Sequence, residues 1–204
     1  MSKGPRIPPI ESVKNAQRIS GFSDAVFAVA ITLLVLQIPI PVQAPDRELV
    51  DDLSNNVPMF VSYVISFWVI AQFWLKHLQF HNCVKHYSMG LVIMNFFYLL
   101  VITFLPYPTA VYGTHSGDPL AAVMYAGAVS FAGLISVNMW RIVIANPRLL
   151  EDGTEVAVAR HVMHIAYVMP AAFAFSIIIV FIYLPAVPYF WVALGIASPL
   201  IRRL

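Results

Sequence analysis

Long apolar runs alternate along this chain with short stretches that carry most of the charges. The first run, about residues 20–38, holds a single charged residue, Asp24. After Arg160 no Asp, Glu, Lys or Arg occurs until Arg202, and that window is too long for one membrane helix of about 20 residues. The sequence Leu-Pro-Ala-Val-Pro at 184–188 divides the window in two. The pattern therefore predicts six transmembrane helices, at about 20–38, 57–75, 87–105, 119–140, 162–184 and 187–201.

Composition supports a membrane protein. Hydrophobic residues make up 60% of the 204 residues and charged residues only 11%, against about 25% in soluble domains. Mean hydropathy is +0.78. The runs are too long for barrel strands and lack their alternation, so we predict an all-α membrane protein with one domain over residues 1–204. The lone cysteine, Cys83, cannot form an internal disulfide.

The placement of Lys and Arg predicts the orientation. Of the 12 basic residues, Arg47 alone falls on the outer side if the N-terminus is cytoplasmic. This bias satisfies the positive-inside rule and predicts that both termini are cytoplasmic. The residues on the inner side are Lys3, Arg6, Lys14, Arg18, Lys76, Lys85, Arg141, Arg148, Arg160, Arg202 and Arg203.

The N-terminus also resembles a signal peptide, because a basic start and an apolar run precede Val-Gln-Ala at 42–44. Three features argue against cleavage. The run has the length of a membrane span, it carries Asp24, and Pro45 would follow the cut. We expect the first helix to be retained.

No motif of a soluble enzyme is present, and neither is a Thr-Val-Gly-Tyr-Gly filter. His77 and His81 have a metal-ligand spacing, but histidines near a helix end are commoner than metal sites. Ser23, Asp24 and His77 include the residue types of a hydrolase triad, but their sequence positions say nothing about triad geometry. We expect no enzymatic activity, no metal, no cofactor and no nucleic-acid partner.

Asp24 is the feature of the first helix that most needs an explanation. It should lie about three residues inside the cytoplasmic end, where a buried carboxylate needs a partner. Arg18 and His77 are candidate partners, and an alternative is a shallow residue that reaches the headgroups. We predict a polar network that holds the first helix against the second. With Phe22 of the motif described below, its members are Arg18, Phe22, Ser23, Asp24, Trp74 and His77.

Helical phasing separates two faces of this helix. At about 100° per residue, Val29, Leu33 and Leu36 lie on one face. Asp24 lies on the opposite side, toward other helices. Thr32 falls near the apolar face, as do Phe22 and Ala25. Periodicity alone fits either ordinary packing or a pore lining.

The residues Arg18-Ile-Ser-Gly-Phe-Ser-Asp24 match the Arg-x-x-x-Phe-Ser-Asp signature of the transmembrane protein 175 family of potassium channels. Residues 73–77, Phe-Trp-Leu-Lys-His, resemble the family's Trp-x-x-His motif at the end of the second helix. Residues 104–109 resemble the end of its third helix. The resemblance covers the first three helices by motif and the rest by topology.

The resemblance implies a potassium-favouring cation channel without a carbonyl filter, in which four copies of the first helix line the pore. With one six-helix repeat, the chain is similar to the prokaryotic, homotetrameric members, which implies a location in the cell's plasma membrane. Potassium and other monovalent cations are then the permeant ions. The resemblance also implies that the apolar face holds the constriction, formed by Val29, Leu33 and Leu36 with Thr32 nearby. Ala25 and Gln37 depart from the family, which often has Gly and an acid there.

Two other interpretations remain open. A proton-coupled secondary transporter would use Asp24 and His77 as a proton relay. Such carriers usually show internal repeats or broken helices, and residues 20–105 and 119–201 share no convincing similarity. An accessory subunit would have no transport activity at all.

Overall fold

The computed structural model describes residues 13–41 and 49–201 of the chain. Within those ranges the backbone is helical apart from turns and one isolated antiparallel bridge between Val84 and Leu150. The predicted all-α fold is confirmed. Several residues used to predict the orientation lie outside the described ranges, namely Lys3, Arg6, Arg47, Arg202 and Arg203.

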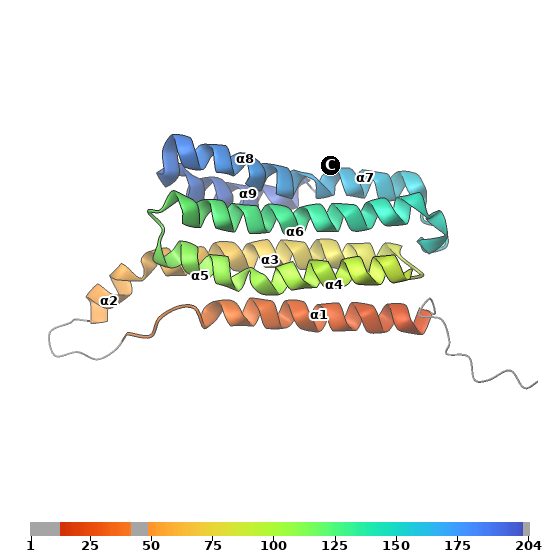
Figure 1. Ribbon diagram of the computed structural model, residues 1–204, viewed down its shortest axis with the longest axis horizontal. Coiled ribbons are helices and arrows are strands. Elements are labelled where there is room, and N and C mark those ends of the chain that lie inside the picture. Colours follow the sequence, from red (N-terminus) through yellow and green to blue (C-terminus); the bar gives the residue numbers. More distant parts are fainter. Residues whose placement is uncertain (1–12, 42–48, 202–204) are drawn as a thin grey trace, which may run out of the picture.

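The helices run largely along one common direction (Figure 1). In this view helix α1 lies at one edge of the bundle, α3, α4 and α5 form the middle, and α7, α8 and α9 lie at the opposite edge beyond α6. Helix α1 packs on α3 and α4, and α6 packs mainly on α8 and α4. The α-helices are α1 (Val13–Val35), α2 (Leu49–Asn55), α3 (Val57–Cys83), α4 (Met89–Phe104), α5 (Pro106–Thr114), α6 (Pro119–Ala145), α7 (Val156–Ala166), α8 (Val168–Tyr183) and α9 (Val187–Ile201).

Local sequence explains where several helices begin. Asp118 precedes Pro119 and accepts a hydrogen bond from the amide of Leu120 at 2.8 Å, which caps α6. Ser88 caps α4 in the same way through the amide of Leu91, at 3.3 Å. Both caps satisfy backbone donors that the first turn of a helix leaves without a partner.

The third span, predicted at about 87–105, corresponds to α4, but a second helix follows it directly. Leu105 keeps a right-handed helical backbone, and Pro106 begins α5, which continues to Thr114. Proline is tolerated in the first turn of a helix because the amide that it lacks has no intrahelical partner there. Residues Met89–Thr114 therefore form one apolar window of 26 residues with a break at Leu105.

The described residues contain five helical windows long and apolar enough to cross a membrane. The last window, Val156–Gly195, has 40 residues and is not one straight helix. It is interrupted at Tyr167, three residues before Pro170, and again by a 3₁₀ turn at Leu184–Ala186. After that turn α9 lies beside α8 in Figure 1, and the two helices pack together. The predicted sixth span coincides with α9.

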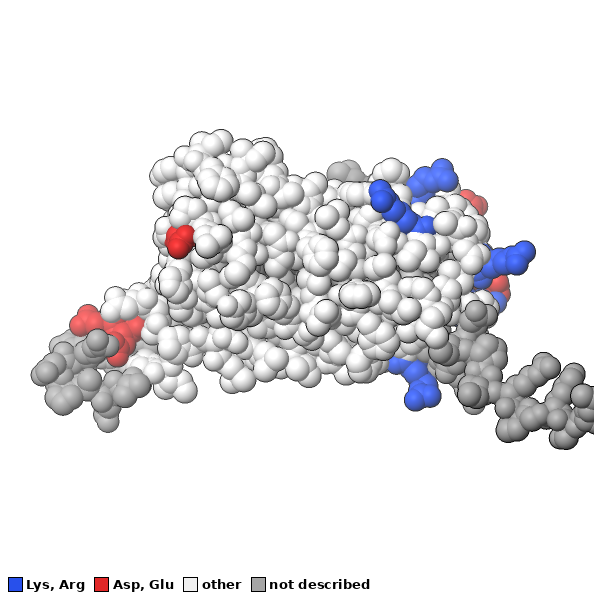
Figure 2. Space-filling model, in the orientation of Figure 1, with Lys and Arg blue, Asp and Glu red and all other residues white. Residues whose placement is uncertain are grey.

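Charged side chains collect at the two ends of the molecule (Figure 2). Lys and Arg lie toward one end, together with some acidic residues, whereas acidic residues of α2 and of the loop before α6 mark the other end. The broad middle of the face in view carries no charged side chain among the described residues. This distribution fits a bilayer around the middle of the bundle.

Candidate functional site

Helix α1 has one face against the bundle and one face that no part of the described chain covers. Phe27, Ala30 and Leu34 are at most 1% exposed. Val29 is 53% exposed and Leu33 is 38% exposed, although both are apolar. Exposed apolar side chains on a helix at the edge of the bundle need a covering of lipid or of protein.

The other two residues of the predicted constriction share this uncovered face. Leu36 is 74% exposed, but it follows the last residue of α1 and lies in a turn. Thr32 is exposed, and its hydroxyl donates to its own helix, with acceptors at the carbonyls of Val29 (2.9 Å) and Ala28 (3.1 Å). Because the hydrogen is directed into the helix, the remaining lone pairs of the hydroxyl oxygen are available to a cation.

Asp24 lies on the covered side of α1 and has a partner on α3. The indole Nε1 of Trp74 donates to the Oδ1 of Asp24 at 2.9 Å. Arg18, one of the two partners expected from the sequence, is exposed and forms no ion pair with Asp24 within the described part of the chain. The other expected partner, His77, hydrogen-bonds to His81 and not to Asp24. The Asp24–Trp74 bond therefore ties the two helices together.

A second polar contact joins α1 to α4. The amide nitrogen of Asn95 donates to the Ser23 hydroxyl at 3.1 Å, and that hydroxyl donates to the carbonyl of Ile19 at 2.9 Å. Both side chains are almost fully buried. Asn95 was not among the residues predicted from the sequence, although an amide in the apolar run of α4 is the kind of residue that marks a functional or structural contact in a membrane helix.

His77 belongs to a separate chain of polar groups near the end of α3. Its Nε2 lies 2.9 Å from the Nε2 of His81, whose Nδ1 hydrogen-bonds the hydroxyl of Tyr87. A neutral His81 satisfies both contacts when Tyr87 donates to Nδ1 and His81 donates to His77. The His77 ring also packs against Phe27 of α1, with ring centroids 5.5 Å apart.

These contacts assign different partners to the residues of the sequence-predicted network. Asp24 and Trp74 meet, Ser23 joins Asn95, and His77 joins His81. Phe22 is half exposed and packs edge-to-face on Phe96 of α4 at a centroid distance of 5.9 Å. Ser23 makes no contact of a nucleophile with a base, because its hydroxyl hydrogen is donated to its own helix.

Comparison with known proteins decides the family. The family described as "Endosomal/lysosomal potassium channel TMEM175" matches residues 18–106. A potassium channel of Chamaesiphon minutus is 33% identical over 138 residues, which are 65% of this chain and 68% of that protein. A potassium channel of Streptomyces collinus is 30% identical over 147 residues, or 70% of this chain and 71% of that protein. The chain belongs to the TMEM175 family.

A solved structure has the same fold. The crystal structure of a lysosomal potassium-selective channel TMEM175 homologue from Chamaesiphon minutus superposes with a TM-score of 0.81, at 25% identity, over 92% of this chain and 97% of that one. The zebrafish endosomal/lysosomal proton channel TMEM175 is 22% identical over 94% of this chain, which corresponds to 38% of its own length. The matched region of this TMEM175 member contains Arg18, Asp24, Trp74 and His77.

Proposed function

We propose that this protein is a potassium-favouring cation channel that conducts across the membrane as a homotetramer, with four copies of α1 around a central axis. Two bacterial relatives that match most of the chain are named potassium channels. The observation that carries the proposal is the uncovered apolar face of α1, opposite a face that is held to α3 and α4. Within the described part of one subunit this face of α1 is left uncovered, and a four-fold symmetric assembly would enclose it around a central pore.

The constriction in this proposal consists of rings of Val29, Leu33 and Leu36, with Thr32 close by. Apolar rings offer no oxygen to replace the water that an ion loses, so a narrow ring stops ions by dewetting. The open form must admit at least partly hydrated ions. Potassium sheds its water more readily than sodium, and an apolar neck therefore favours potassium modestly. The Thr32 oxygen contributes one acceptor per subunit beside this neck.

The proposal includes six membrane passes with both termini in the cytoplasm of a prokaryotic cell. The basic end of the bundle then faces the cytoplasm, in agreement with the positive-inside rule (Figure 2). Within the window Val156–Gly195, the turn at Leu184–Ala186 supports a fifth and a sixth pass in place of one. The acidic residues of α2 then face outward.

The carrier hypothesis gains no support from the side-chain contacts. A relay through Asp24 and His77 requires the two groups to exchange a proton, directly or through water. The carboxylate of Asp24 accepts a hydrogen bond from the indole of Trp74, which is a donor only and cannot take up a proton to pass it on. His77 contacts His81 and not Asp24. The channel is therefore the better-supported function.

Recording from purified protein in planar bilayers tests the proposal. A channel gives single-channel currents that are ohmic and carry potassium in preference to sodium, whereas a carrier gives saturable coupled exchange and an accessory subunit gives no flux. Mass measurement of the same preparation in detergent should show a homotetramer. A stable monomer or trimer that conducts would contradict the assembly.

A further inference from the structure

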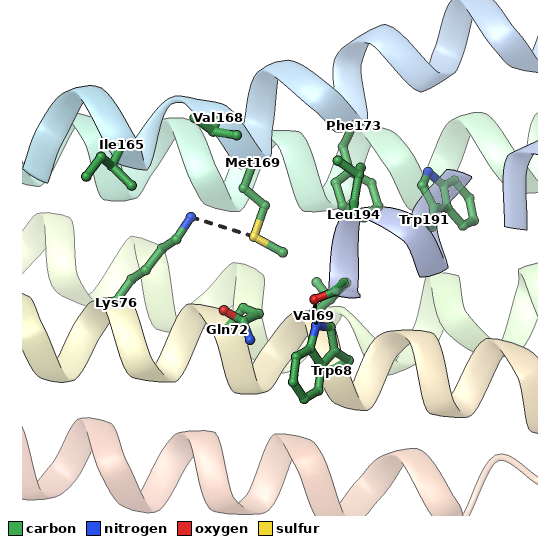
Figure 3. A pocket seen from close by; sticks show the side chains of 11 residues that line it. Trp68, Val69, Gln72, Lys76, Ile165, Val168, Met169, Phe173, Trp191 and Leu194 are labelled. Atoms are coloured by element: carbon green, nitrogen blue, oxygen red, sulfur yellow. Dashed lines mark hydrogen bonds between the residues drawn. The ribbon is translucent and has the colours of Figure 1, made fainter. Parts of the chain in front are cut away.

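A hollow of about 460 Å³ lies on the surface of the bundle between α3 and α9. Its wall is apolar, with Val64 and Trp68 on α3 and Trp191 and Val192 on α9. The indole nitrogen of Trp68 donates to the carbonyl of Gly195 on α9 at 2.8 Å, so the indole lies against that helix (Figure 3). A Cβ on Gly195 would lie 2.7 Å from the Trp68 ring, and the glycine therefore permits this close contact. The contact joins the two walls of what we call the α3–α9 hollow.

Two aromatic rings lie on another surface of the subunit, where α4 is followed by α5. Phe104 and Tyr107 are both exposed. Their ring centroids lie 5.5 Å apart, so the two side chains form one contiguous surface, which we call the aromatic pair. Large apolar rings on the outside of a membrane bundle are covered by lipid or by protein, and aromatic residues are enriched where protein subunits meet.

A buried polar contact relates the positions of the hollow and the aromatic pair. The hydroxyl of Thr109 on α5 lies 2.8 Å from the hydroxyl of Ser66 on α3. Val64 and Tyr107 each come two residues before one of these partners, which is a turn of about 200° around the helix. Val64 therefore points away from α5, and Tyr107 points away from α3. Two residues correspond to only about 3 Å along a helix, so the two surfaces lie at similar depths on opposite sides of the subunit.

Helix α1 packs against both sides, because it contacts α3 as well as α4 and α5. Its uncovered face carries Val29 and Leu33. When this face is turned toward a central four-fold axis, the α3–α9 hollow and the aromatic pair lie on the two flanks of the subunit. Rotation about an axis along the membrane normal leaves the depth of every residue unchanged. A cyclic assembly places one flank of each subunit against the opposite flank of the next, so a hollow and an aromatic pair face each other at every interface.

We propose that the α3–α9 hollow of each subunit receives the aromatic pair, Phe104 and Tyr107, of a second copy of this chain. The inference rests on the proposed function, which supplies four copies around one axis. A cavity of about 150 Å³ holds a benzene ring, so a hollow of about 460 Å³ has room for both rings. Lipid tails are as apolar as these side chains, and association in a membrane therefore depends on how well the surfaces pack. Two rings seated in a hollow provide such packing, and four contacts of this kind close the ring of subunits.

Cysteine cross-linking of the full-length protein in membranes tests this contact. Cys83→Ser removes the only native cysteine, and Val64→Cys with Tyr107→Cys then places one thiol on each surface. A short bismaleimide should give a ladder of dimers, trimers and tetramers on a denaturing gel, and nothing larger. Each single-cysteine protein should remain a monomer on the gel. Val64→Cys with Ile93→Cys is the matched control and should give no ladder, because Ile93 is exposed on α4 but lies about 20 Å nearer the basic end.

Truncation of the aromatic pair measures its contribution to assembly. Phe104→Ala with Tyr107→Ala should raise about tenfold the protein concentration at which tetramers dissociate in detergent, as expected for the loss of aromatic anchors at an interface. Native mass spectrometry of a dilution series gives this concentration. Phe181→Ala, which removes an exposed ring from α8, is the control and should leave it unchanged.

The outcomes separate this contact from the proposed function. A tetrameric parent whose Val64→Cys and Tyr107→Cys protein gives no ladder overturns the contact and leaves the channel intact, because lipid then covers the hollow. Unchanged dissociation after truncation of the aromatic pair overturns the contact as well. So does a cross-linked dimer from Val64→Cys alone, because identical flanks then meet. A parent that is not a tetramer overturns the proposed assembly, and this contact with it.

Discussion

The indole nitrogen of Trp74 lies 2.9 Å from the carboxylate of Asp24 and joins the second long helix to the first. This bond sets the rotation of α1. With Asp24 turned toward α3, the opposite face of α1 is left uncovered, and Val29 and Leu33 lie on it. A polar contact at one end of the helix thus determines which apolar residues are available to line a pore.

The first prediction concerns that bond. Trp74→Phe and Asp24→Ala should each lower the apparent melting temperature of the assembly in detergent, because a hydrogen bond to a charged group contributes about 1.5–3 kcal/mol. The double variant should lose little more than either single one, because both remove the same contact. Phe97→Leu, at an exposed position of α4, is the control. Fully additive losses would show that the two residues act independently.

Asp24→Ala extends this test to function. The change should reduce assembly or folding more than it alters ion preference, because Asp24 faces α3 and not the uncovered face. Size-exclusion chromatography and reversal potentials measure the two effects. Normal tetramers with an altered ion preference would place Asp24 in the ion path.

The second prediction concerns Ser23 and Asn95. Ser23→Ala leaves the Asn95 amide without its acceptor at a position that is 1% exposed, and this should cost about 1–3 kcal/mol. Replacing both partners, with Ser23→Ala and Asn95→Leu, should restore much of the loss because no buried polar group is then left unpaired. Thermal melting of the three variants measures this. A double variant that is less stable than Ser23→Ala alone would contradict it.

The third prediction compares two glycines of α6. A Cβ on Gly133 would lie 2.8 Å from the ring of Pro170, where α8 begins, whereas a Cβ on Gly127 meets nothing within 4 Å. Gly133→Ala should therefore cost about 1–3 kcal/mol through overpacking, and Gly127→Ala should cost nothing. Melting temperatures of the two proteins check this. Equal melting temperatures would mean that the α6–α8 contact adjusts without cost.

The fourth prediction concerns pH at the basic end. Lys85 and Asp152 form an ion pair that joins the α3–α4 loop to the loop after α6. The hydrogen bond from Lys85 lowers the pKa of Asp152. The contribution of this carboxylate to stability is therefore present above its usual pKa, about 3.9, and is lost as pH falls through the lowered value. The same bond raises the pKa of Lys85, so the contribution of the ammonium group to stability is lost only as pH rises through that raised value.

Asp152→Asn should therefore lower the melting temperature slightly at pH 7 and have no effect at a pH below the lowered pKa. The effect is small because both groups are exposed to solvent. Backbone bonds from the amides of Lys85 and Glu151, to Leu149 and Cys83, keep the loops together in either state. A difference that persists at low pH would show that the variant acts through something other than the charge.

Sequence patterns predicted the beginning of α6 and the course of α9 because local signals determine both. Asp118 followed by Pro119 is a helix start, and the two prolines at 185 and 188 mark the turn before α9. Pro106 indicated the end of α4 but not the helix that follows, since a proline is compatible with the end of one helix and with the first turn of the next. Leu105 keeps a helical backbone between the two helices, so that α5 follows α4 directly.

Within the site, the phasing of α1 indicated that Asp24 points away from the apolar face, and the sequence placed Trp74 at the same depth. The sequence did not identify which side chains hydrogen-bond to each other, because contacts between helices depend on the rotation of each helix about its axis. Asn95 was missed for that reason. The hydrogen bond from the Trp68 indole to the Gly195 carbonyl was out of reach as well, since the two residues lie 127 positions apart in the sequence.

The fifth prediction is that the uncovered face of α1 lines the ion path. Val29→Ala, Leu33→Ala and Leu36→Asn widen or wet the neck, and each should raise conductance and reduce the preference for potassium over sodium. Ala substitution of an exposed residue elsewhere, such as Phe181 on α8, is the control and should leave both unchanged.

The most direct measurement is the single-channel conductance and reversal potential of Leu33→Ala beside the parent, in planar bilayers with potassium on one side and sodium on the other. The account predicts a larger conductance and a reversal potential closer to zero. A Leu33→Ala channel with the conductance and reversal potential of the parent, together with unchanged Val29→Ala and Leu36→Asn channels, would show that the ion path lies elsewhere.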